Sequence, residues 1–197
     1  MLPLRPQQGG FIRPFGCGWF IREFLLGNGP EGSPAIDPEG GACQSDTFYQ
    51  YKLALHKAYA DDAVAWENEE RIRRGKPIYT PEEYEERVAW FLSRIPYKLY
   101  KCRYHSFQRY FHWLKQLGWV EFTGKEETSA IQESYPDAPP RRYYRLTEKG
   151  INAPDYEWSR PQLVLYPDLG QDYFREKRKG RLYSPKAKTK SRKTRQT

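Results

Sequence analysis

The stretch from residue 106 to residue 147 constrains the fold more than any other part of the chain. Apolar side chains recur at helical spacing over residues 107–117, and Gly118 supplies a stop. Residues 119–123 then alternate between apolar and polar, as in a strand, and residues 142–147 have the pattern of its partner. The sequence therefore predicts a helix followed directly by a two-stranded ribbon.

The predicted helix carries hydrogen-bond donors on the face opposite its apolar one. They are Gln108, Arg109, His112 and Lys115. Ser106 is expected to cap the helix N-terminus, because a serine hydroxyl there accepts from a free backbone N–H group. Donor-rich side chains bind phosphates and base edges, and on a helix they can enter the major groove of DNA together.

The segment before this helix is basic. No acidic residue occurs between positions 94 and 120, whereas lysine and arginine recur there. We expect residues 97–104 to form a basic connection to the helix. The predicted DNA-binding set therefore also includes Lys101, Arg103 and Ser106.

Two runs in this region resemble a known family. SFQRYFHWLKQLGWVE at 106–121 and YYRLTEKG at 143–150 are similar to the recognition helix, the first wing strand and the closing strand of winged-helix transcription regulators of the PadR and MarR type. The similarity covers about 45 residues. It implies that the four donors of the helix contact the major groove, and that the wing touches the backbone or minor groove through Arg141, Arg142 and Arg145.

The chain departs from this family in three places. A long loop, 27–46, and a long helix precede the helix that starts at Pro81, so the supporting helix is not identified. The predicted wing loop, 124–140, contains four acids, so we do not expect its tip to press on DNA. The pattern of a dimerising helix after the last strand is interrupted by Pro154, which leaves dimerisation open.

Three further helices are expected before the ribbon. One covers residues 18–26 and ends at Gly27, and the second covers 47–75 with Ser45 or Asp46 as its N-cap. The third has a capping box formed by Thr80 and Glu83 and ends by residue 95.

The expected fold class is α+β, mainly α: a winged helix with a helical core and a two- or three-stranded wing. The predicted organisation is an extended arm at 1–14, the winged-helix domain at 15–150 with its inserted loop 27–46 and long helix 47–75, a C-terminal extension at 151–183, and a disordered basic tail at 184–197. The extension packs on the domain or docks a partner. We favour packing.

Positive charge is concentrated at the C-terminus. From residue 175 onward there are eleven Lys and Arg residues against one acid, whereas the rest of the chain is nearly neutral. Such a tail adds sequence-independent affinity for phosphates or serves only solubility. We expect the first role.

Several classes of protein are not expected from this sequence. No catalytic or nucleotide-binding motif is present, so neither an enzyme nor a cofactor is predicted. Cys102, His105 and His112 lack a fourth metal ligand, so no metal site is predicted. We expect free cysteines, no membrane span, and a cytoplasmic protein, nucleoid-associated if bacterial.

Two functional hypotheses remain. In the first, the chain is a DNA-binding protein, either a transcription regulator or a winged-helix protein of a mobile element or the replication machinery, and it reads double-stranded DNA. In the second, the winged helix is a protein-interaction module in a nucleoprotein assembly, with a protein partner or a second copy of the chain. Arg109 could pair with an acid of residues 61–86, and the two hypotheses differ in whether that acidic segment covers the donor face.

Overall fold

The computed structural model describes residues 14–29 and 33–167. Nearly all of the predicted arm, the second half of the predicted extension and the whole basic tail lie outside the described residues. In chain order the elements are α1 (Cys17–Leu25), β1 (Ala42–Cys43), α2 (Gln44–Arg73), α3 (Pro81–Leu92), α4 (Tyr97–Tyr100), α5 (Tyr104–Gln116), β2 (Val120–Glu127), a short 3-10 helix (Ala130–Glu133), β3 (Arg141–Leu146), α6 (Glu148–Asn152), α7 (Asp155–Ser159) and α8 (Pro161–Leu165).

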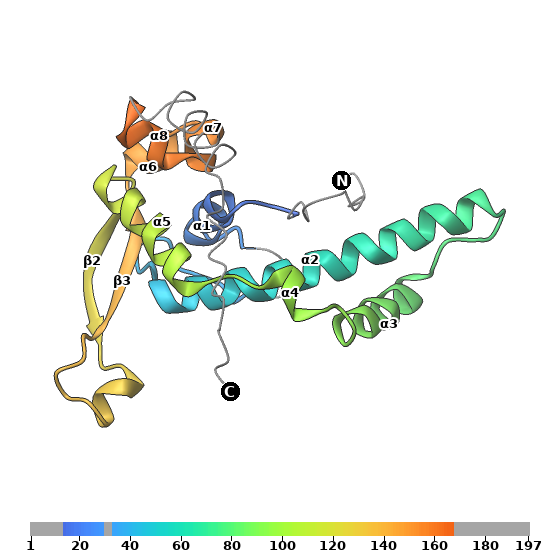
Figure 1. Ribbon diagram of the computed structural model, residues 1–197, viewed down its shortest axis with the longest axis horizontal. Helices are drawn as coiled ribbons and strands as arrows, with labels where there is room; N and C mark the ends of the chain where they lie inside the picture. The colour runs from blue at the N-terminus through green and yellow to red at the C-terminus, as the bar shows by residue number, and fades with distance from the viewer. Residues whose placement is uncertain (1–13, 30–32, 168–197) are drawn as a thin grey trace, which may run out of the picture.

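The predicted α+β, mainly helical class is confirmed. The three described strands form one antiparallel sheet in the order β1-β3-β2, at one end of the molecule (Figure 1). The β2–β3 hairpin pairs Val120 with Leu146 and Glu127 with Arg141, and β1 pairs Ala42 with Tyr144 on the other edge of β3.

The main core is aromatic and lies between the sheet and the helices. Its largest buried side chains come from α1, α2, α5, the turn before β2 and the C-terminal helices, and they include Phe20, Tyr51, Phe111, Trp119 and Trp158. The rings of Trp119 and Trp158 lie 5.0 Å apart, which packs α7 against the start of the hairpin. The described part of the C-terminal segment therefore packs on the main core.

Close packing at Gly18 fixes α1 against two other elements. A Cβ there would collide with the carbonyl oxygen of Trp158 and with the hydroxyl of Tyr110. That hydroxyl donates to the same carbonyl, so α5 and α7 meet directly over α1. Burial raises the pKa of Tyr110, which keeps its hydroxyl protonated as a donor.

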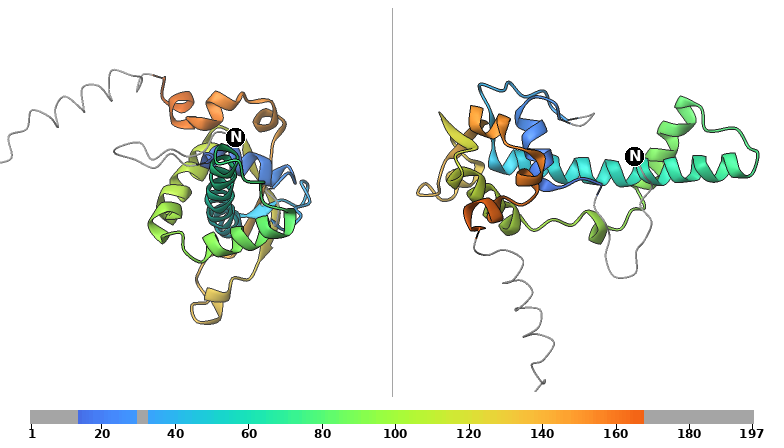
Figure 2. Two further views of the ribbon diagram at one scale, coloured as in Figure 1. Left: turned by 90° about the vertical axis from the view of Figure 1, so that its right-hand side faces the viewer. Right: turned by 90° about the horizontal axis from the view of Figure 1, so that it is seen from above.

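Helix α3 and the C-terminal half of α2 form an arm that extends away from the sheet (Figures 1 and 2). A small apolar cluster of Ala60, Val64 and Val88 joins the two helices. Glu67 accepts two hydrogen bonds of 2.6 Å from Arg87, which lowers the pKa of Glu67. The predicted capping box at the start of α3 is confirmed: the hydroxyl of Thr80 accepts from the backbone N–H of Glu83, and the reciprocal bond is also present.

Two predictions about connecting segments were wrong. The predicted loop 27–46 contains strand β1, and α2 begins at Gln44, ahead of both Ser45 and Asp46. The predicted basic connection 97–104 contains the short helix α4 and the first residue of α5. Both elements are too short for a periodic pattern to indicate them.

Candidate nucleic-acid interface

Helix α5 begins one turn earlier than the sequence indicated. Its N-cap is Arg103, and Ser106 lies in the first turn, so the prediction of Ser106 as the cap was wrong. No side chain caps this end of α5. The N-terminal end of α5, next to Lys101 and Arg103, favours an anion through the helix dipole, although the N–H of Ser106 already donates to the carbonyl of Arg103.

A glycine ends α5 as predicted and aims the chain into the hairpin. Gly118 has a φ of 69°, a left-handed conformation that glycine adopts without strain. The N–H of Gly118 donates to the carbonyl of Lys115 and the N–H of Trp119 donates to that of Leu114, which is the Schellman pattern. Strand β2 begins two residues after this glycine.

The apolar face of α5 is buried. Phe107, Phe111 and Leu114 have 3% or less of their surface exposed. Phe107 contacts the ring of Phe48 on α2, and Phe111 contacts Tyr144 on β3. The helix is therefore held on two sides, and its orientation relative to the sheet is fixed.

The opposite face of α5 is exposed and carries the predicted donors. They are Gln108, Arg109, His112 and Lys115. The guanidinium of Arg109 lies 3.0 Å from Nε2 of His105 one turn earlier, and among the described residues it has no carboxylate partner. The alternative pairing of Arg109 with the acidic segment 61–86 is therefore wrong, and the donor face is not covered by the arm.

Lys115 connects this face to the sheet. Its ammonium group lies 5.3 Å from the ring centroid of Tyr144, within the range of a cation–π contact. The side chain is nevertheless exposed, and no described carboxylate pairs with it. Lys101, Arg103 and Ser106 are also exposed, at the N-terminal end of α5.

The predicted wing arginines differ from the donors of α5, because all three are paired with carboxylates. The register of the hairpin places Glu121 opposite Arg145 and Glu126 opposite Arg142. The guanidinium of Arg142 binds Glu126 at 2.7 Å, and that of Arg145 binds Glu121 at 2.9 Å. The register of Val120 and Leu146 gives the Glu121–Arg145 pair, whereas a register shift between Phe122 and Glu126 sets the Glu126–Arg142 pair, and the strand pattern does not indicate that shift.

Arg141 is held against the start of α2. It binds the carboxylate of Asp46 and donates to the thiol sulfur of Cys43 at 3.2 Å. Hydrogen bonding to Cys43 raises the pKa of Arg141. Arg141 therefore joins β3 to the start of α2 and does not extend toward solvent as a free cation.

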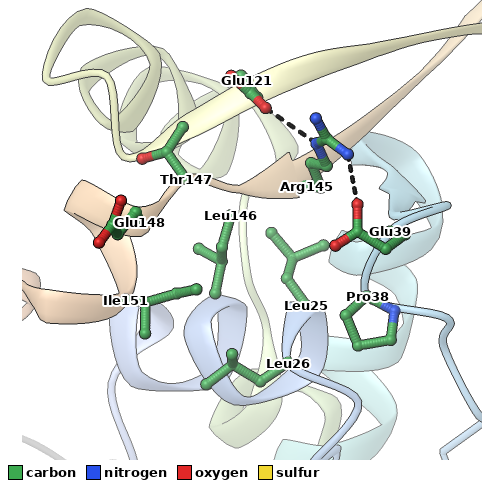
Figure 3. A pocket seen from close by; sticks show the side chains of 10 residues that line it. All are labelled: Leu25, Leu26, Pro38, Glu39, Glu121, Arg145, Leu146, Thr147, Glu148 and Ile151. Carbon is green, nitrogen blue, oxygen red and sulfur yellow. Dashed lines mark hydrogen bonds and ion pairs between the residues drawn. The ribbon is translucent and has the colours of Figure 1, made fainter.

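A pocket of about 350 Å³ lies at the base of the hairpin (Figure 3). Its apolar part is formed by Leu25, Leu26, Leu146 and Ile151. Arg145 reaches across it between Glu121 and Glu39, and binds Glu39 at 2.5 Å. Arg145, the one cation among the described residues that line the pocket, is thus neutralised by two carboxylates, so this lining does not suit a phosphate.

The described residues show no group of three or more His, Cys, Asp or Glu side chains that could hold a metal ion. Within the same residues, no helix combines the length and the apolar character needed to cross a membrane. Comparisons with known protein families, with curated proteins and with solved structures gave no match for this chain.

Proposed function

We propose that the chain is a winged-helix protein that binds double-stranded DNA by inserting α5 into the major groove. The observation that carries this proposal is the two-faced character of α5, which is packed on one side and carries four exposed donors and no acid on the other. A helix fixed in this way can bring several donors to base edges at once.

The order of the elements supports the winged-helix part of the proposal. Helices α1, α2 and α5 pack around one core, and α5 leads directly into the β2–β3 hairpin. Strand β1 completes a three-stranded sheet, and a three-stranded wing is one of the two alternatives that the sequence predicts. Helices α3 and α4 then form an insertion between the second and third helices of the motif.

The charge distribution supports a nucleic-acid ligand. The segment from residue 94 to residue 120 holds six lysines and arginines and no acid, and α5 lies within it. Binding that neutralises phosphates with such residues releases counterions and weakens as salt rises. A sequence preference would come from Gln108 and His112, whose side chains can bond to base edges.

Selection from a randomised pool of duplexes tests this proposal. The full chain should enrich one family of sequences, and Gln108→Ala should relax the preference at one position, by roughly 1–3 kcal/mol of discrimination. Asn152→Ala, which removes an exposed amide from α6, serves as the matched control and should leave the preference unchanged. Enrichment of no sequence by the wild-type chain would refute the reading role of α5.

A protein-interaction role is the second candidate, and the arm favours it. Trp66, Ile72 and Ile78 have more than half of their surface exposed there, which is unusual for large apolar side chains grouped on one projection. If the pool gives no enriched sequence, this role becomes the better account of the fold.

A further inference from the structure

Exposed tyrosines and cations adjoin the N-terminal end of α5. Tyr97 on α4 and Tyr104 at the start of α5 have 52% and 40% of their surface exposed. Between them lie Lys98, Lys101 and Arg103, all exposed. We call residues 97–104 the tyrosine strip.

The two exposed rings of the strip, those of Tyr97 and Tyr104, are held from one side. The ring of Tyr104 packs on that of Phe48 of α2 with centroids 5.0 Å apart. The ammonium group of Lys52 lies between Phe48 and Tyr97, 5.9 Å and 5.5 Å from their ring centroids. Tyr97 also contacts Tyr100 edge-on. The rings are therefore fixed in place while much of their surface is open to solvent.

The two chain segments that border the strip contain no acidic residue. No Asp or Glu occurs in residues 47–60 of α2 or in residues 94–120. The view from above shows α4 and α5 on the same side of α2 (Figure 2). The strip thus extends the donor face of α5 toward the arm, and like that face it carries positively charged side chains.

Proteins bind single-stranded nucleic acid through surfaces on which fixed aromatic rings are interspersed with cations. Bases stack on the rings and the backbone phosphates meet the cations, with little dependence on sequence. A duplex cannot use the rings in this way, because its bases are already stacked on one another. In a nucleic-acid complex the rings can therefore stack only on the bases of a strand that leaves the duplex.

We propose that the tyrosine strip binds a single-stranded DNA segment that continues from the duplex held by α5. The substrate class is then a junction between duplex and single strand, as opposed to an uninterrupted duplex. This inference rests on the proposed function for the duplex part, whereas the strip itself is argued from its own residues.

Fluorescence anisotropy with the full chain tests the proposal. The probes are one blunt duplex and the same duplex with a 5′ or 3′ oligo(dT) overhang of about ten nucleotides, within the range of known single-strand site sizes. One overhang should tighten binding roughly fivefold or more over the blunt duplex. Tyr97→Leu should remove most of that gain and Tyr97→Phe should keep it, because stacking needs the ring and not the hydroxyl.

The control variant is Tyr156→Leu, which removes a tyrosine that is 72% exposed on α7, away from the strip. It should retain the overhang gain, and thermal unfolding should show that each variant is folded. An overhang that adds no affinity, or a gain that survives Tyr97→Leu, overturns the proposal. Binding to the overhang strand without binding to the blunt duplex would support the strip and refute the duplex-reading function.

Discussion

Removing two cations from the exposed face of α5 should reduce the salt dependence of duplex binding by a calculable amount. Arg109 and Lys115 have no carboxylate partner among the described residues, so both charges are available to phosphates. Each neutralised phosphate contributes about 0.9 to the slope of log K against log salt. The double variant Arg109→Gln, Lys115→Gln should therefore have a slope shallower by about 1.8.

This change in slope has a direct consequence for affinity. Over a fourfold rise in salt, the wild-type chain should lose about 12-fold more affinity than the double variant. Both side chains are exposed and the buried face of α5 is untouched, so the free energy of unfolding should change by no more than about 0.5 kcal/mol. The assay is a titration of one labelled duplex at several salt concentrations, together with urea unfolding of both proteins.

The arm offers a control with the same loss of charge. Arg73 and Arg74 are exposed at its tip and both pair with Glu70. Arg73→Gln with Arg74→Gln should leave the slope nearly unchanged. A slope of the α5 variant equal to that of wild type, or an equal decrease in the arm control, would refute the assignment of α5 as the contact surface.

Three further predictions concern stability and the basic tail. Trp158→Ala should lower the free energy of unfolding by about 3–5 kcal/mol in urea, because it leaves a cavity against Trp119 and removes the bond to Gly150; a loss below 1 kcal/mol would contradict the core described above. Arg87 lowers the folded-state pKa of Glu67, so the Glu67 carboxylate stabilises the fold above its unfolded pKa of about 4.3 and loses this contribution as pH falls through its folded pKa. Glu67→Gln should therefore make the free energy of unfolding fall less steeply as the solution is acidified. An unchanged fall would argue against the Glu67–Arg87 pair. Removal of residues after Tyr183 takes away six lysines and arginines, so the salt slope should fall by up to about 5 while the preferred sequence stays the same, and a lost preference measured on the same pool would assign the reading to the tail.

Local chemistry explains why several elements could be predicted from sequence alone. The capping box at Thr80 and the stop at Gly118 depend on residues a few positions apart, and both are confirmed. The apolar face of α5 could be predicted in the same way, because the helical spacing of Phe107 and Leu114 indicates that both side chains are buried. Ser106 was wrongly predicted as the N-cap of α5 because a serine also fits the first turn of a helix. The choice between Ser106 and Arg103 as the cap depends on packing against distant segments, which the neighbouring residues in the sequence do not reveal.

Non-local pairing explains what the sequence could not show. Strand β1 has two residues and exists because Ala42 meets Tyr144, about a hundred positions away. The pairing of Arg141 with Asp46 depends on that same contact between distant segments. The exposure of the donors on α5 was predictable from their polarity, whereas the neutralisation of the wing arginines required the strand register.

That neutralisation locates the proposed DNA contact within the fold. The bond to Glu126 uses only Nε of Arg142, so a phosphate bound by the other N–H groups of this exposed guanidinium would lie close to the carboxylate of Glu126, which repels it. The same holds for Arg145 and Glu121. Arg109 and Lys115 of α5 have no carboxylate partner among the described residues, so the proposed binding of a phosphate there would break no such pair. We therefore expect a duplex to dock on α5, with the hairpin beside it.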